Sequence, residues 1–261
     1  MSARRRIVIG ALFASLAGAA EPYRVALLES PALWARSLSG QLSGRGFSVN
    51  AVTAAQLMGS PTSAAAACDC LIVPDSPRVP ASACPALLAF VKGGGDLVLL
   101  GGRAFAEAGE GVDEALRREA FDDYEVYRLR GVCAVKANRG QDWLTRDTTL
   151  SGAFTGVSAL GFPALGDATY VPLLAAEDRY GRVRGWAAGL LVHHAGAFAG
   201  SQWLLAGVNE PAFYEAPAVQ DMIADALGYD AVEFTAVTAA TRTELLDAGD
   251  IDCVLATFTI T

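Results

Sequence analysis

The sequence has few histidines, few lysines and no excess of positive charge. Two histidines and five cysteines are present among 261 residues. The histidines, His193 and His194, are adjacent and would point to opposite faces of a strand, whereas a zinc site needs three or four convergent ligands. We therefore expect no metal site and no other cofactor. The net charge of −8 excludes a nucleic-acid groove, because phosphate contacts require clustered lysine and arginine.

Long hydrophobic runs are also missing, apart from one near the N-terminus. Residues 7–17 are apolar, follow three arginines at positions 4–6, and lead into an Ala-Gly-Ala tripeptide at 17–19. This layout is typical of a secretory signal peptide, and the run is too short to span a bilayer comfortably. We expect residues 1–20 to be removed on export, which leaves a periplasmic or extracellular protein. The alternative is a buried N-terminal helix or strand.

The five cysteines are an odd number, so they cannot all pair within one chain. Cys68 and Cys70 lie two positions apart at the start of an apolar run, and the second Cys pair that a metal site would need is missing. The simpler interpretation is that they are small buried hydrophobic residues. In an exported protein, a disulfide from Cys68 or Cys70 to Cys84 is the alternative.

Apolar sequence is abundant. Hydrophobic residues make up 52% of the chain, which suffices for a sizeable core and is too much for a disordered protein. Continuous apolar strands that alternate with helices predict an α/β fold with a parallel sheet covered on both faces. The strands of this kind are expected at 23–29, 47–52, 70–74 and 96–101, and the helices at 31–46 and 85–92.

The middle of the chain has a different pattern, which adds a mixed or antiparallel part to the mainly parallel sheet. Residues 121–137 alternate in part, as a half-buried strand does, and Gly181 marks a hairpin-like turn. Further strands are expected at 170–174, 183–193 and 202–208, and a closing helix at 216–227. The sharpest boundary lies near Gly228, so we expect a domain over 21–227 and a strand–helix–strand extension over 228–261.

Two stretches resemble the class I glutamine amidotransferase-like superfamily: GGGDLVLLGGRAF at 93–105 and the run from Tyr170 to Val208. The resemblance covers about 23–227. It is closest to bacterial amidotransferase-like domains found in exported proteins beside glycoside hydrolase modules. It implies a flavodoxin-like three-layer sandwich.

The same resemblance implies where a nucleophilic cysteine would stand, on a tight turn just after the strand 96–100. Gly101, Gly102 and Arg103 occupy that turn here, and neither histidine is followed by the family's His-x-Glu pattern. A cysteine mechanism needs nucleophile and base within hydrogen-bond reach. We therefore expect no enzyme, but a non-catalytic exported module that binds a small polar ligand, such as a carbohydrate, or a protein partner. A displaced nucleophile, Cys133 or Cys68, is the enzymatic alternative.

Polar residues that follow the expected strands are the candidate ligand contacts, because ligands of open α/β sheets bind at the carboxyl ends of the strands. Glycines let backbone approach a ligand closely, and an arginine can bind a carboxylate or a sugar hydroxyl. The alternative is ordinary turn chemistry. The candidates are Glu29, Ser30, Asp75, Ser76, Gly101, Gly102 and Arg103.

From about residue 219 the chain resembles the family 3 solute-binding proteins of amino-acid ABC transporters, through the strand at 232–237, Arg242 and the closing Thr259-Ile260-Thr261. The resemblance implies that Thr257, Thr259 and Thr261 contact an amino acid. The alternative function is therefore a periplasmic amino-acid-binding component of an ABC importer, present as a truncated or fused fragment and partnered by the permease. The family's carboxylate-binding arginine and second lobe are absent, and the segment would equally extend the amidotransferase-like sheet.

Overall fold

The computed structural model describes residues 22–53, 55–56, 68–74, 84–101, 125–138, 149–154, 156–161 and 166–228. All of them belong to one compact unit, Glu21–Tyr229. In chain order its elements are β1 (Arg24–Leu28), α1 (Leu33–Gly44), β2 (Ser48–Val52), β3 (Cys70–Val73), α3 (Cys84–Lys92), β4 (Asp96–Leu99), β5 (Glu125–Leu129), β6 (Val132–Ala137), β7 (Thr149–Phe154), β8 (Val157–Gly161), β9 (Ala168–Glu177), β10 (Val183–His193), the 3₁₀ turn η4 (Gly196–Phe198), β11 (Gln202–Ala206), α6 (Pro211–Glu215) and α7 (Pro217–Gly228).

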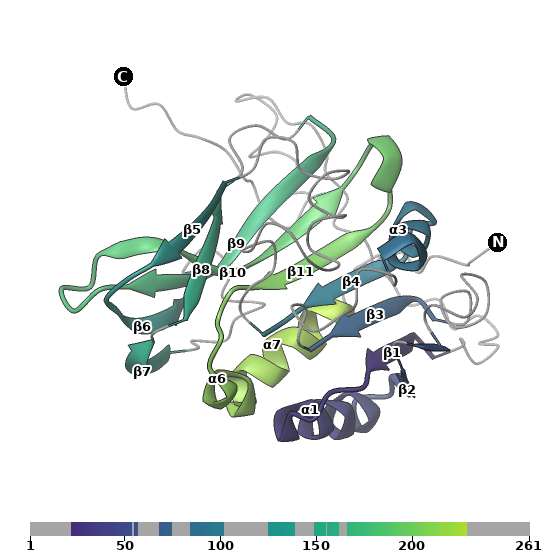
Figure 1. Cartoon of the computed structure of the whole chain (residues 1–261), viewed down its shortest axis with the longest axis horizontal. Coiled ribbons are helices and arrows are strands. Elements are labelled where there is room, and N and C mark those ends of the chain that lie inside the picture. The colour runs from purple at the N-terminus through teal and green to yellow at the C-terminus, as the bar shows by residue number, and fades with distance from the viewer. Residues whose placement is uncertain are drawn as a thin grey trace, which may run out of the picture. The chain divides into compact units, whose positions relative to one another are not determined.

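A nine-stranded sheet runs through this unit in the order β2-β1-β3-β4-β11-β10-β9-β6-β7 (Figure 1). The pairs from β2 to β11 are parallel, and those from β11 to β7 are antiparallel. The parallel half has the flavodoxin-like order, in which the first strand lies between the second and the third. The sheet is therefore mixed, and the predicted mainly parallel arrangement holds for one half of it.

Helices cover both faces of the parallel half, because its strands are apolar on both sides. All four residues of β3 are buried. On one face, Leu87 and Val91 of α3 share a buried cluster with Leu71, Leu97 and Trp203. On the other face, Ala226 and Leu227 of α7 lie beside Val98 and Leu204, whose side chains alternate with those of the first face. This half is a three-layer sandwich.

The antiparallel half corrects two expectations. The single strand expected at 121–137 is two strands, β5 and β6, separated by a turn at Gly131, and they enter different sheets. The two-stranded sheet β5-β8 packs on β10, where a Cβ on Gly185 would lie 2.8 Å from the Cβ of Ala159. The strand expected at 170–174 is longer, because β9 and β10 form a hairpin whose pairing continues to Glu177 and Val183.

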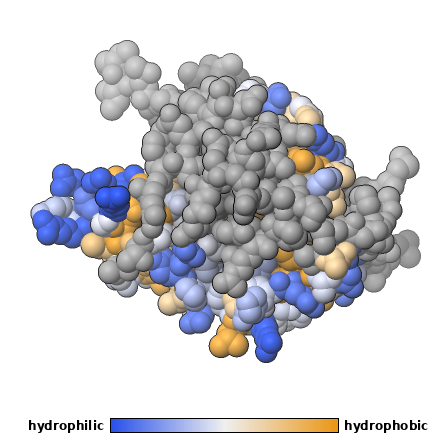
Figure 2. All heavy atoms as spheres, viewed as in Figure 1, coloured by the Kyte–Doolittle hydropathy of each residue, from blue (hydrophilic) through white to orange (hydrophobic). Residues whose placement is uncertain are grey.

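Hydrophilic side chains gather at the end of the described unit where the β9–β10 hairpin turns, on the left of Figures 1 and 2. No helix among the described residues is long and apolar enough to cross a membrane. Of the strand–helix–strand extension expected over 228–261, the structure describes only Gly228, which ends α7. The N-terminal segment 1–20 lies outside the described residues.

Candidate functional site

The carboxyl ends of β1, β3 and β4 lie at one edge of the sheet, because these strands are parallel neighbours. Glu29 and Ser30 directly follow β1, and Gly101 comes shortly after β4. One strand, β3, separates β1 from β4, so the two chain segments are about 10 Å apart at typical strand spacing. The structure thus brings together three of the residues that the sequence analysis named as ligand contacts.

Glu29 is the charged group at the end of β1. Its backbone N–H donates to the carbonyl of Val52 at 2.8 Å, which fixes the main chain, while its side chain is exposed. The neighbouring Ser30 hydroxyl accepts a hydrogen bond from the N–H of Ala32 at 3.2 Å, just before α1 begins. The Ser30 oxygen therefore stabilises the turn, and the Glu29 carboxylate is available to solvent.

The turn after β4 is held by a buried tyrosine. Gly101 has φ +93°, a conformation that side chains disfavour, and its N–H donates to the hydroxyl of Tyr214 at 2.9 Å. The same hydroxyl donates to the carbonyl of Val208 at 2.6 Å, and the carbonyl oxygen of Ala206 is a second acceptor 3.2 Å from it. One phenol oxygen thus ties the turn after β4 to the segment after β11.

Residues from three helices fix this tyrosine in place. Tyr214 lies in α6 and stacks on Trp34 of α1, with ring centroids 4.5 Å apart. The carbonyl of Tyr214 accepts a hydrogen bond from Gln220 Nε2 of α7 at 2.8 Å, and Ser37 of α1 donates to Gln220 Oε1 at 3.2 Å. None of these four side chains was predicted from the sequence as part of a site; the only local signal is the pair Phe213-Tyr214 shortly after a predicted strand.

Both histidines lie at the opposite end of the sheet from this turn. Val192 pairs with Gln202, the first residue of β11, so His193 lies at the amino ends of β4 and β11. Gly101 is five residues along from Asp96 at that end, which corresponds to about 17 Å of extended chain. Neither histidine can therefore act as a base for a group on the turn after β4.

His193 is buried against Phe198 and Trp203, with ring centroids 5.4 and 4.6 Å away. Burial lowers the pKa of His193 to about 4, and the neighbouring His194 acts in the same direction while Asp167 opposes it. The side chain is consequently neutral at pH 7. Its Nε2 has no hydrogen-bond partner among the described residues.

Neither cysteine next to β3 has the character of a nucleophile. Cys70 is fully buried, and burial raises the pKa of its thiol well above the usual value. Burial also raises the pKa of Cys68 to about 11. Cys70 agrees with the interpretation as a small buried hydrophobic residue, whereas Cys68 is half-buried; neither forms a disulfide in the described part of the chain. Cys133 is an exposed thiol on β6.

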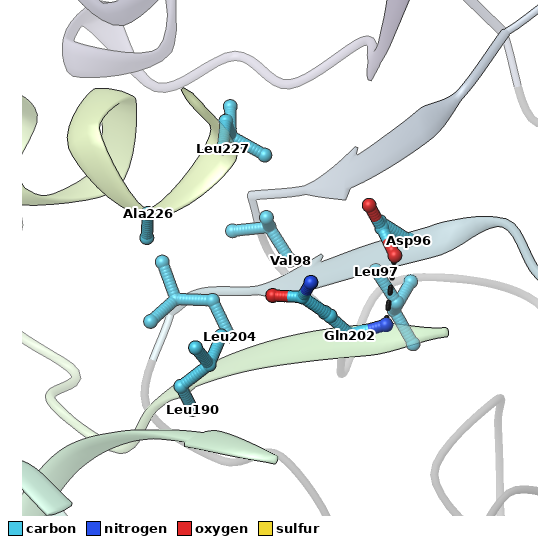
Figure 3. Close-up of a pocket in the computed structure, with 8 residues that line it drawn as sticks. All are labelled: Asp96, Leu97, Val98, Leu190, Gln202, Leu204, Ala226 and Leu227. Carbon is cyan, nitrogen blue, oxygen red and sulfur yellow. Dashed lines mark hydrogen bonds between the residues drawn. The ribbon is translucent and has the colours of Figure 1, made fainter. Parts of the chain in front are cut away.

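A pocket lies on the α7 face, near the amino ends of β4 and β11 (Figure 3). The backbone N–H of Gln202 donates to Asp96 at 2.7 Å, and the hydroxyl of Tyr23 donates to the same carboxylate at 2.5 Å. The other residues that line it, Leu97, Val98, Leu190, Leu204, Ala226 and Leu227, are apolar. This pocket is therefore a packing gap between α7 and the sheet. The Asp96 carboxylate at its rim holds the first residue of β11 in place through its hydrogen bond with Gln202.

The remaining candidate residues, Asp75, Ser76, Gly102, Arg103, Thr257, Thr259 and Thr261, lie outside the described residues. No group of three histidine, cysteine or acidic side chains that could hold a metal ion occurs in the described part of the chain.

The comparisons with known proteins concern the fold. No protein-family model and no curated protein sequence matches this chain. Among solved structures, the chain is similar to α-L-fucosidase isoenzyme 2 from Paenibacillus thiaminolyticus, with 17% identity and a TM-score of 0.51. The likeness covers 78% of this chain but 32% of the fucosidase, so the chain spans about a third of that enzyme's length.

Two further solved structures are similar at lower scores. One is described as a GMP synthase component from Thermoplasma acidophilum, with 8% identity, a TM-score of 0.48, and coverage of 79% of this chain and 93% of that one. The other is a ThuA-like protein from Bacteroides uniformis, with 10% identity, a TM-score of 0.49, and coverage of 83% and 94%. At 17% identity, the likeness to the fucosidase concerns the fold alone.

Proposed function

We propose that this chain is a non-catalytic α/β module that binds a small polar ligand at the carboxyl edge of its parallel strands. The turn after β4 carries the proposal. The sequence resembles the amidotransferase-like superfamily, and active members of that superfamily have their nucleophile on this turn. The described residue of that turn is a glycine whose N–H is already bound to Tyr214. The sequence continues with Gly102 and Arg103, so no cysteine, serine or threonine occupies the turn.

A carbohydrate-related ligand suits the groups that are present. The Glu29 carboxylate can accept hydrogen bonds from sugar hydroxyls, and Arg103, by its place in the sequence, can donate to them. The fold likeness to a third of an α-L-fucosidase, and the resemblance to domains that accompany glycoside hydrolase modules, support the same class. These observations favour a module that holds a sugar without cleaving it.

The test is titration calorimetry of the full chain with L-fucose and D-galactose at millimolar concentration. We expect heat of binding, and we expect Glu29→Gln and Arg103→Gln each to weaken it about tenfold through loss of a charged hydrogen bond. Asp167→Asn, an exposed acidic position at the opposite edge, is the matched control and should bind as the wild type does. No heat with either sugar would refute the carbohydrate assignment.

The non-catalytic character has its own measurement. The purified chain should release no more ammonia from L-glutamine than buffer does. Release that disappears in Cys133→Ser or Cys68→Ser would show a displaced nucleophile and overturn the proposal. Heat of binding with L-glutamine or another amino acid, but not with the sugars, would instead favour the amino-acid-binding alternative and its permease partner.

Export is the second part of the proposal, and it rests on residues 1–20 of the sequence alone. Expression of the full reading frame in a bacterium, followed by cell fractionation and N-terminal sequencing, tests it. We expect a periplasmic or secreted product that begins near Glu21. A cytoplasmic product that retains the three arginines would contradict export.

A further inference from the structure

The turn of the β9–β10 hairpin lies beyond the end of β11, whereas on its other side β6 pairs with β9 as far as Glu177. The last residue of β11, Ala206, pairs with Ala188, so β10 continues for five residues past the end of its neighbour. At the usual rise this is about 17 Å of strand. On the left of Figure 1 the turn forms the end of the hairpin, beside β6. Residues 179–184 are all exposed, so the turn is accessible to another molecule.

Positive charge is concentrated on this turn, although the whole chain is acidic. Arg179, Arg182 and Arg184, which together with Tyr180 and Val183 form what we call the basic tip, lie within six residues of one another. Arg182 and Arg184 share a single carboxylate, Asp178, at 3.4 and 3.7 Å, and both side chains remain more than half exposed. The three guanidinium groups of the tip therefore face one shared carboxylate, Asp178. Glu177, the other carboxylate beside the turn, is paired with Lys136 at 2.5 Å.

The carboxylate of Asp178 shapes the turn more than it neutralises it. It accepts hydrogen bonds from the N–H groups of Tyr180 and Arg182 at 2.9 and 3.1 Å, around Gly181 at φ +72°. Burial alone would raise the pKa of Asp178, but these hydrogen bonds and the nearby guanidinium groups hold it below the usual value. The turn is therefore a fixed loop with a permanently charged centre.

The tip also has an apolar part and ordered arginines. Tyr180 is 63% exposed and Val183 is 54% exposed, which makes them two of the three large hydrophobic residues that are exposed in the described part of the chain. The guanidinium carbons of Arg179 and Arg182 lie 4.6 and 4.9 Å from the centre of the Tyr180 ring. Stacking restricts both arginines before any ligand binds, which lowers the entropic cost of binding.

We propose that the basic tip is a docking surface for an acidic polypeptide segment of a partner protein. Arginine and tyrosine are the residues that contribute most to protein interfaces, and a planar guanidinium binds a carboxylate with two parallel hydrogen bonds. The tip is too small to follow a long polyanion, and the net charge of −8 would repel one beyond the tip. A short segment with carboxylates and an apolar side chain matches both parts of the surface.

The proposed docking surface is independent of the proposed ligand site, and it is tested with a short fluorescein-labelled peptide in which L-glutamate alternates with L-leucine. We expect the full chain to raise the anisotropy of the probe at low salt and progressively less as salt is added, because exposed charges are screened. Arg179→Gln should weaken binding about tenfold through loss of a charged hydrogen bond. Arg36→Gln on α1, the same charge change at an exposed distant position, should leave binding unchanged.

The substitution Tyr180→Ser separates a built surface from simple charge attraction, since it keeps every arginine but removes the stacking. We expect several-fold weaker binding in that variant. Absence of binding at low salt, or equal weakening by Arg36→Gln, would refute the proposal. So would binding of a heparin fragment or of phosphatidylserine vesicles, but not of the glutamate–leucine peptide, at the same arginines. Self-association that is lost in Arg179→Gln would identify a second copy of this chain as the occupant and overturn it as well.

Discussion

At the scale of single residues, the hydroxyl of Tyr214 has a larger structural role than its size indicates. It is a polar atom in a buried aromatic pair, and it connects two chain segments that the sequence separates by more than a hundred residues. The turn on which the proposed ligand site depends is consequently positioned by packing from α1, α6 and α7 as well as by the glycine at position 101.

Tyr214→Phe tests this role. The change removes the acceptor for the Gly101 N–H and the donor for the Val208 carbonyl while keeping the ring that stacks on Trp34. We expect a loss of about 1–3 kcal/mol in the free energy of unfolding, because buried polar groups lose their partners. Urea unfolding followed by circular dichroism measures it. Tyr180→Phe, at an exposed tyrosine, is the control, and an equal loss in both variants would contradict the assignment.

His193 gives the stability of the protein a pH dependence at the residue scale. Its pKa is about 4 in the folded chain and the usual value is 6.5, so the unfolded chain binds the proton more tightly. The contribution of the neutral, buried ring is complete above pH 6.5 and is lost as the pH falls toward 4. This shift corresponds to about 3 kcal/mol at most.

The measurement is urea unfolding at pH 7.5, 5.5 and 4.5 for the wild type and for His193→Gln. Other acidic groups also titrate in this range, so the informative quantity is the difference between the two proteins. We expect the wild type to lose more stability on acidification than the variant. His194→Gln, at the exposed neighbour, should behave nearly as the wild type. Parallel curves for wild type and His193→Gln would show that the ring accepts a proton without cost.

At the scale of secondary structure, the contact between β8 and the end of β11 depends on a glycine. A Cβ on Gly207 would lie 1.9 Å from the backbone carbonyl oxygen of Ser158, a group that cannot move without displacing β8. The Ser158 N–H also donates to the Gly207 carbonyl at 2.7 Å. The two-stranded sheet is thereby attached to the central sheet through a close approach of two backbones.

Gly207→Ala should therefore be more damaging than its single methyl group implies. We expect the free energy of unfolding to fall by about 1–3 kcal/mol, the usual cost of adding atoms to a packed site. Gly152→Ala in β7 is the matched control, because a Cβ there meets nothing within 4 Å. Thermal unfolding of both variants gives the comparison, and equal melting temperatures would show that β8 can shift to accommodate the methyl group.

The elements that sequence patterns predicted well are the apolar strands of the parallel half. Runs such as 70–74 are buried on both faces and bounded by polar or small residues, so local sequence defines them. β7 and β8 were missed because Thr149–Phe154 and Val157–Gly161 are rich in small residues and show no clear alternation. The candidate site was predicted only at its strand ends, since the Gly101–Tyr214 contact spans 113 positions and leaves no local pattern.

At the scale of the whole molecule, the nine-stranded sheet of the described unit is continuous although one half is parallel and the other antiparallel. β11 joins β4 on one side and β10 on the other, and buried residues such as Trp203 and Leu191 belong to one cluster across that junction. The parallel and antiparallel halves should therefore not melt independently.

Equilibrium unfolding in urea tests this continuity with two probes. Far-ultraviolet circular dichroism reports on the helices of the parallel half, whereas tryptophan fluorescence includes Trp186 and Trp203 in β10 and β11. We expect the two transitions to share one midpoint. Midpoints that differ beyond experimental error would show that the halves are separate folding units joined at β11.

The position of β11 also has a consequence for how the protein is made. β4 is complete at Leu99, but the strand that pairs with its open side begins only at Gln202. While the ribosome synthesises the residues in between, the nascent chain carries the parallel strands β2, β1, β3 and β4 with an unpaired apolar border on β4. During this stage of translation the unpaired edge of β4 can pair with other polypeptide chains. Either chaperones or rapid synthesis of β11 must prevent such pairing.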